Sequence, residues 1–174
     1  IIRSSYEICM NAVSTCNQIY YLIKNSEAEI KNRERVLAEI RGVRTFWYYF
    51  LIDNWGNVPI VTNFEDTSLP STKSRKEVYE FIVSELNEIK DLVRDDVSSS
   101  SYGKITKGVI YTLLAKMYLN AMVWNPEDGP KWQECMDACD SVMNLPYIIE
   151  PDWKANFKVN NEISREIIFP AIFS

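Results

Sequence analysis

The stretch that decides the fold runs from Arg41 to Val61 and reads RGVRTFWYYFLIDNWGNVPIV. Its first part has the three- and four-residue apolar spacing of an amphipathic helix and ends in a cluster of aromatic residues. Gly56 can adopt the left-handed backbone that closes a helix, and Pro59 cannot continue one. Val58 precedes a proline and is therefore biased towards extended backbone. The stretch predicts a long helix that stops at Gly56 and leaves through a short extended segment.

The rest of the chain has the same helical periodicity. Apolar spacing predicts five helices, over about residues 4–24, 28–55, 106–122 and 130–144, with one more that begins at Ser74. Ser74 and Glu77 have the spacing of a capping box. A short strand is predicted over 166–169. The side chains expected to be largely buried are Trp47, Ile82, Leu86, Leu113, Met117 and Met136, and Trp132 falls on the expected buried face of the last helix.

A weak internal sequence repeat supports a repeated helical hairpin. The triplet Arg41-Gly42-Val43 matches Lys107-Gly108-Val109, 66 positions further along the chain. The same offset aligns the apolar positions of the helix before each triplet. Two similar helix pairs followed by the start of a third are typical of a tetratricopeptide-like stack with long loops.

Composition excludes several classes of function. The chain has 174 residues, 47% of them hydrophobic, which is enough for one proper core. Its 24 acidic and 19 basic residues give a net charge of −5, without the basic face of a nucleic-acid binder. The longest apolar run, 46–52, is too short to span a bilayer. The chain has no histidine, which removes the histidine-dependent nucleophile systems and the histidine-based zinc sites.

The four cysteines are expected to be reduced. Cys9 and Cys16 are separated on one helix by about 10 Å of rise, which is beyond disulfide reach. Cys135 and Cys139 lie one turn apart on a helix. With no Cys-x-x-Cys motif, no calcium-loop spacing of acidic residues and no acid/base motif, the sequence predicts no metal, no cofactor and no catalytic residues.

Several motifs, in order, resemble the SusD/RagB family. The helix at 6–23, with Asn17 near its middle, resembles the first scaffold helix of that family. The helix over 38–60 with its G-x-V-P-I exit, and LLAKMYLN at 113–120, resemble later ones, and 166–169 resembles the strand that follows. Arg44 and Phe46 depart from the small or aliphatic residues expected there.

The resemblance implies an all-α, curved stack of tetratricopeptide-like hairpins, with 1–174 as a single helical domain truncated at both ends. Family members are surface glycan-binding lipoproteins of the outer membrane. The resemblance therefore implies non-catalytic binding of an oligosaccharide and its delivery to a SusC-like TonB-dependent transporter. It implies membrane attachment only through a lipid anchor outside this chain.

Sequence alone also suggests where a sugar would bind. Trp47 and its aromatic neighbours point all round a helix, so most of them are expected to pack internally. Trp124 and Tyr102 fall in predicted loops, and Trp124 is followed by Asn125 and further polar residues. A flat apolar ring beside hydrogen-bonding groups suits a carbohydrate. Trp124, Tyr102 and Asn125 are therefore the predicted ligand-binding residues.

Two other classes of function remain open at this stage. The first is a tetratricopeptide-type module that binds a peptide in its concave groove, although the chain lacks the regular 34-residue period. The second is an α-helical carbohydrate-active enzyme, since paired carboxylates can hydrolyse glycosidic bonds.

Overall fold

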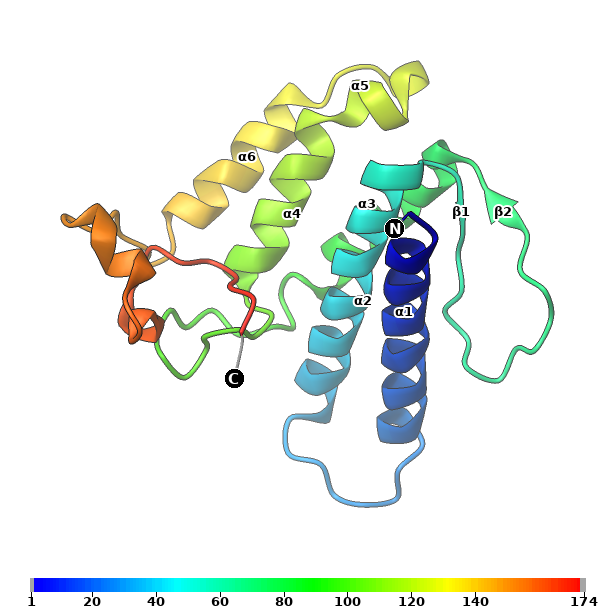
Figure 1. Ribbon diagram of the computed structural model, residues 1–174, viewed down its shortest axis with the longest axis horizontal. Helices are drawn as coiled ribbons and strands as arrows, with labels where there is room; N and C mark the ends of the chain where they lie inside the picture. The colour runs from blue at the N-terminus through cyan, green and yellow to red at the C-terminus, as the bar shows by residue number, and fades with distance from the viewer. Residues whose placement is uncertain (1, 173–174) are drawn as a thin grey trace.

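The computed structural model describes residues 2–172 and confirms the all-α prediction. Helices α1 (Ile2–Lys24) and α2 (Arg33–Trp55) lie side by side as a hairpin, and α3 (Arg75–Ile89) packs against α2 (Figure 1). Helix α4 (Lys107–Leu119) contacts α3 and packs along α6 (Trp132–Met143). The short helix α5 (Ala121–Trp124) and three 3₁₀ turns, Pro126–Asp128, Trp153–Phe157 and Asn161–Ile163, complete the helical elements of the described chain.

The helix ends follow local chemistry. Gly56 has φ 72° and closes α2, as predicted, and Ser74 and Glu77 form the predicted capping box of α3. Helix α2 begins later than predicted because Asn32 turns the chain with a φ of 56°. The Arg33 guanidinium then donates to the carbonyls of Ile23 at 3.1 Å and Ser26 at 2.8 Å, which fixes the turn between α1 and α2.

The extended exit from α2 is also present. Strands β1 (Val58–Pro59) and β2 (Thr72–Lys73) pair antiparallel, with Val58 opposite Lys73. The strand predicted over 166–169 is wrong, because the structure places no strand edge beside this segment. Phe169 instead packs on α2, its ring centroid 5.1 Å from that of Phe46.

Burial matches the prediction for α3 and α4 but not for α6. Ile82, Leu86, Leu113 and Met117 are buried, whereas Trp47 is only half-buried. Met136 is 58% exposed, so its predicted burial is wrong, and Trp132 is 53% exposed. Helix α6 packs on α4 through small side chains: Ala138 is buried, and the Cys135 thiol donates to the Ala115 carbonyl at 3.4 Å. Its larger apolar side chains therefore face outwards.

Two further observations agree with the sequence. All four cysteines are free, as predicted. None of the helices formed by residues 2–172 has the length and apolar character needed to cross a membrane.

The glycine of the internal sequence repeat has the same packing role in both copies. Gly42 in α2 and Gly108 in α4 are both buried, and each leaves room for a side chain of a later segment. A Cβ at Gly42 would lie 2.7 Å from Ile105 Cγ2, and one at Gly108 would meet the Tyr147 ring. The repeated glycine thus allows the next segment to approach the second helix of each hairpin.

A buried ion network ties the first three helices together. Arg44 of α2 is 4% exposed and donates to Asn17 Oδ1 of α1 at 2.9 Å and to Glu85 Oε2 of α3 at 2.7 Å. Arg41 holds the same carboxylate through a bond of 2.8 Å to Oε1 and one of 3.1 Å to Oε2. Burial raises the pKa of Glu85, but hydrogen bonds and charge from the two arginines outweigh it and leave that pKa below its ordinary value.

We expect Glu85→Gln to lower the free energy of unfolding by roughly 3–5 kcal/mol at neutral pH, because it leaves the buried Arg44 without its counter-charge. Since the folded-state pKa of Glu85 is lowered, its contribution is present above the ordinary carboxyl pKa and is lost as pH falls through the lowered value. The difference from the unaltered protein should therefore shrink in acid. Urea titrations at several pH values measure both effects.

Glu88→Gln is the matched control. Glu88 also pairs with Arg41, but its side chain is 58% exposed, so the loss should stay below about 1 kcal/mol. Equal losses for the two variants would contradict a structural role for the buried pair.

Candidate functional site

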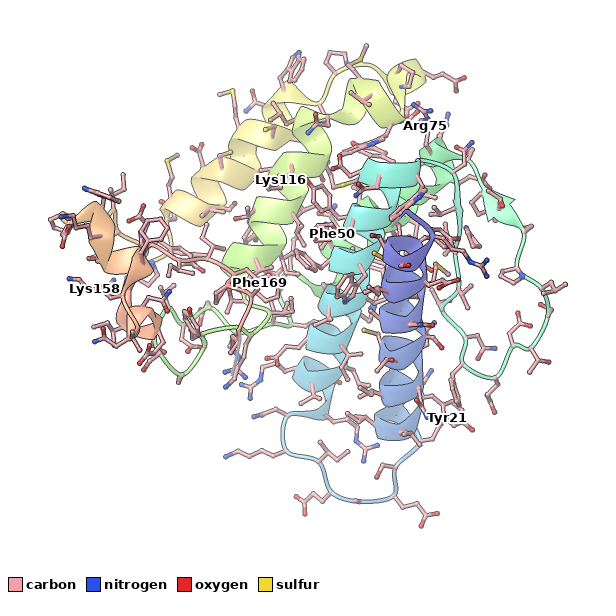
Figure 2. All side chains as sticks on the ribbon, viewed as in Figure 1. Tyr21, Phe50, Arg75, Lys116, Lys158 and Phe169 are labelled. Atoms are coloured by element: carbon pink, nitrogen blue, oxygen red, sulfur yellow. The ribbon has the colours of Figure 1, made fainter. Side chains whose placement is uncertain are left out.

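The most sugar-compatible surface lies where α1 ends. A hollow of about 280 Å³ opens between the last turns of α1 and the segment that follows β1. We call it the α1 hollow; Figure 2 labels Tyr21, which projects from the lower end of α1. The hollow is lined by Asn17, Tyr20, Tyr21, Lys24, Asn25, Thr62, Asn63, Phe64 and Glu65.

Side chains of α1 and α2 hold the segment after β1 in place. The Asn17 amide donates to the Val61 carbonyl at 2.9 Å. The Tyr48 hydroxyl accepts from the Val61 N–H at 2.7 Å and donates to its carbonyl at 3.2 Å. Burial raises the pKa of Tyr48 to about 12, so the hydroxyl keeps its proton at neutral pH. The backbone of Val61 is thereby fixed on α2, and residues 62–65 become one wall of the hollow.

The hollow combines ring faces with polar groups. The rings of Tyr21 and Phe64 lie 5.6 Å apart, and Phe64 is 42% exposed. The Tyr21 hydroxyl donates to Glu65 Oε1 at 3.0 Å, and this bond raises the Tyr21 pKa. Amides and hydroxyls of the neighbouring side chains line the same space. An exposed aromatic face beside such groups can stack on a sugar ring and hydrogen-bond its hydroxyls.

The structure does not place Trp124 in an open loop. Trp124 ends helix α5 and is 5% exposed, with its ring centroid 6.4 Å from that of Tyr49 and 6.3 Å from that of Tyr79. The expectation that it offers a free ring face is therefore wrong. The cause is the additional turn of helix after α4, which directs the ring into the space between α2 and α3.

Asn125 is buried next to Trp124. It is 1% exposed, and its amide donates to Asp128 Oδ2 at 2.8 Å. Its Oδ1 is buried without a hydrogen-bond partner among residues 2–172. Asn125 thus closes the 3₁₀ turn after α5 and does not line the surface hollows described here.

Tyr102 lies at the opposite end of α4 from Trp124. The thirteen residues of α4 separate the two rings by about 20 Å of helix, so they do not form one site. Tyr102 is half-buried, and its hydroxyl donates to Asn161 Oδ1 at 2.8 Å. The adjoining cavity, of about 10 Å³, holds no more than one water molecule.

Sequence reasoning missed Phe64, although its own criterion would have found it. Thr62, Asn63 and Glu65 surround Phe64 in a loop, as polar residues surround Trp124. No local sequence pattern marks Tyr20 or Tyr21 as ligand-binding, because they line the hollow only once the segment after β1 packs beside α1.

The described part of the chain contains no cluster of three metal-ligating side chains. The carboxyl groups with shifted pKa values all shift downward, since hydrogen bonds and nearby cations outweigh burial. They are Asp66, Glu77, Glu85, Asp96 and Glu166.

Fold and hollow together define a helical scaffold protein with a surface site suited to a polar, ring-shaped ligand. A family model described as "Starch-binding associating with outer membrane", SusD-like, matches residues 2–119. The match covers more than half of the chain, and the chain belongs to this SusD-like family of carbohydrate-binding proteins.

Individual relatives agree with this assignment. The chain is 28% identical over 140 residues to the starch-binding protein SusD of Bacteroides thetaiotaomicron, covering 78% of this chain and 25% of SusD. A SusD superfamily protein from Parabacteroides distasonis has the same fold, with a TM-score of 0.86 at 22% identity, over 99% of this chain and 38% of that one.

Another structure with the same fold was solved with a glycan. It is surface glycan-binding protein A from Bacteroides thetaiotaomicron in complex with laminarihexaose, with a TM-score of 0.77 at 24% identity, over 95% of this chain and 34% of that one. The chain therefore spans about a quarter to two fifths of the length of these relatives.

We expect Trp124→Ala to destabilise the fold by roughly 3–5 kcal/mol, because it removes a buried aromatic side chain from the core. Trp132→Ala removes the same side chain from an exposed position and should change the free energy of unfolding by less than about 1 kcal/mol. Chemical denaturation of both variants tests the assignment. A Trp124→Ala variant as stable as Trp132→Ala would mean that the Trp124 ring is not packed as described.

Proposed function

We propose that this chain belongs to a non-catalytic protein that binds an oligosaccharide at the bacterial cell surface and delivers it to a SusC-like TonB-dependent transporter. Membership of a family described as starch-binding and outer-membrane-associated supports this proposal. The protein would be a surface-exposed outer-membrane lipoprotein, held by a lipid anchor outside these residues.

Within this chain, we assign sugar contact to the α1 hollow. The carrying observation is the exposed Phe64 ring beside Tyr21, surrounded by amide and hydroxyl groups. A pyranose ring stacked on Phe64 would place its hydroxyls near Asn25 and Asn63. Tyr102 is a secondary candidate, since its ring is only half-buried, although its hydroxyl is already bound to Asn161.

Binding alone accounts for this role. The hollow needs to hold the glycan reversibly while the transporter takes it up, and stacking with hydroxyl hydrogen bonds gives moderate affinity. The net charge of −5 suits a neutral glycan better than a polyanionic one. The downward pKa shifts of the carboxyl groups also favour binding over glycoside hydrolysis, which requires a carboxylic acid with a raised pKa.

The peptide-module alternative has less support in the first hairpin. The groove between α1 and α3, where a peptide would bind, contains the chain's own residues around Val61 and Thr62. A peptide could enter only by displacing a segment that α1 and α2 hold with three hydrogen bonds.

We expect Phe64→Ala to weaken oligosaccharide binding by the intact protein about tenfold, because it removes an exposed stacking surface. Calorimetry with malto-oligosaccharides and with laminarihexaose measures this loss. The melting temperature should change little, since Phe64 lies in a surface loop and is not part of the hydrophobic core.

Phe157→Ala is the matched control, because Phe157 is 80% exposed and lies in a 3₁₀ turn at the other side of the molecule. It should bind the sugar normally. Unchanged affinity in Phe64→Ala would move the glycan site away from the α1 hollow, and absence of any oligosaccharide binding by the intact protein would refute the proposed function itself.

A further inference from the structure

A second hollow, of about 250 Å³, lies between α3, α4 and α6. We call it the α6 hollow. Its α3 wall presents Asn87 and Lys90, and its floor on α4 presents Tyr111 and Tyr118. Its third wall, on α6, presents Glu134 and Asp137.

The α6 hollow occupies in the second repeat the place that the groove beside α1 occupies in the first. The offset of 66 positions that relates the two glycine triplets also relates the lining residues of the two grooves. It carries Tyr21 onto Asn87, Lys24 onto Lys90, and Tyr48 onto Leu114 in the floor of the α6 hollow.

The first groove shows what such a place can hold. Its occupant is extended polypeptide, bound through the backbone of Val61 by the amide of Asn17 and the hydroxyl of Tyr48. Neither contact depends on the side chain of the occupant. The groove therefore binds backbone through an amide and a phenol.

The α6 hollow offers other groups, because the same offset replaces Asn17 by Val83 and Tyr48 by Leu114. Both amide hydrogens of Asn87 are already donated, one of them to the Val83 carbonyl at 2.9 Å, so the free donors are tyrosine hydroxyls. The Asn87 amide donates to the Tyr118 hydroxyl oxygen at 3.1 Å, and Lys90 donates to Asn87 Oδ1 at 3.1 Å. Because the Tyr118 oxygen accepts, its own hydrogen can be donated to a carbonyl. The Tyr111 hydroxyl adds a second group of the same kind.

The α6 wall adds a charge requirement. Glu134 and Asp137 face the hollow from one helix, and Lys90 faces it from the other side. Asp137 Oδ1 accepts from Gln133 at 2.8 Å, and Glu134 lies 3.8 Å from Lys131 at an exposed position. The lining therefore has one positive and two negative groups, which favours a ligand with a basic side chain.

We propose that the α6 hollow binds an extended polypeptide segment of a partner protein, with a lysine or arginine placed beside Glu134 and Asp137. This inference does not rest on the proposed sugar binding. The α6 wall lies outside residues 2–119, the part of the chain matched by the family model.

The test peptides are derived from the segment of this chain that lies in the first groove. Capped octapeptides with the sequence of residues 58–65, VPIVTNFE, each with one position replaced by arginine, are titrated into the ¹⁵N-labelled full chain. At least one arginine peptide should produce saturable amide shifts confined to 87–90, 111–118 and 134–141. The unsubstituted, acidic peptide should bind at least fivefold more weakly.

Variants then separate the hollow from the rest of the surface. The double variant Glu134→Lys/Asp137→Lys should weaken binding at least tenfold, and Asp137→Lys alone should also weaken it, whereas Asp140→Lys, the same single charge reversal on α6 outside the hollow, should not. Ser141→Trp fills the hollow without a change of charge and should also abolish binding. Amide spectra of each free variant confirm that the fold is kept.

Three results would overturn the proposal. The first is that none of the arginine peptides gives saturable shifts. The second is that the shifts lie around Asn17 and Tyr48, or persist in the double variant. The third is that laminarihexaose or a malto-oligosaccharide, and not a peptide, shifts residues 134–141, which would make the hollow a sugar site. Loss of sugar binding at the α1 hollow would leave this proposal untouched.

Discussion

The buried pair of Arg44 and Glu85 is the constraint on which the rest of the structure depends. A charged guanidinium inside a small helical domain is costly to bury unless its hydrogens find partners. Here the two terminal nitrogens of Arg44 find partners on α1 and α3, whereas its Nε is buried without a partner among residues 2–172. Helix α2 therefore cannot pack with either neighbour in an arbitrary register. The same contact places Asn17 so that its amide reaches the Val61 carbonyl, which turns an ion pair between helices into an anchor for the loop.

That anchor determines which surfaces are available for ligands. With the segment after β1 seated between α1 and α3, the first groove is divided into the aromatic hollow beside Phe64 and a hollow of about 300 Å³ between Thr62 and the charged side chains of α2 and α3. Among residues 2–172, no such segment enters the second groove, because the chain between α4 and α6 forms α5 and a 3₁₀ turn and buries Trp124. The first helical repeat thus presents a groove divided by the protein's own chain, with an aromatic rim, and the second presents an undivided hollow.

Sequence patterns predicted the features that depend on near neighbours in the chain. The stop at Gly56, the capping box at Ser74 and the five long helices need only local information. Whether an apolar stripe is covered depends on a partner element, and periodicity does not identify that partner. Met136 and Trp132 lie on a regular stripe, yet α6 meets α4 through Ala138. The prediction for Trp124 is wrong for the opposite reason: helical structure continues to Trp124, two residues beyond the predicted end at 122, and this places a predicted loop side chain in the core.

Arg44 shows how far a departure from an expected pattern can be informative. An arginine inside an aromatic helix is unfavourable on local grounds, so its presence indicates a partner elsewhere in the fold, although sequence alone does not say where. The structure identifies Glu85, which lies on the buried side of α3, beside Ile82, Leu86 and Ile89. No motif or spacing in the sequence singles out Glu85, because the pairing of its carboxylate depends on how α2 and α3 pack together. The placement of the candidate binding residues also depends on contacts between elements. Tyr21 and Phe64 form one surface because Arg44 holds Asn17, and Asn17 holds the loop that carries Phe64.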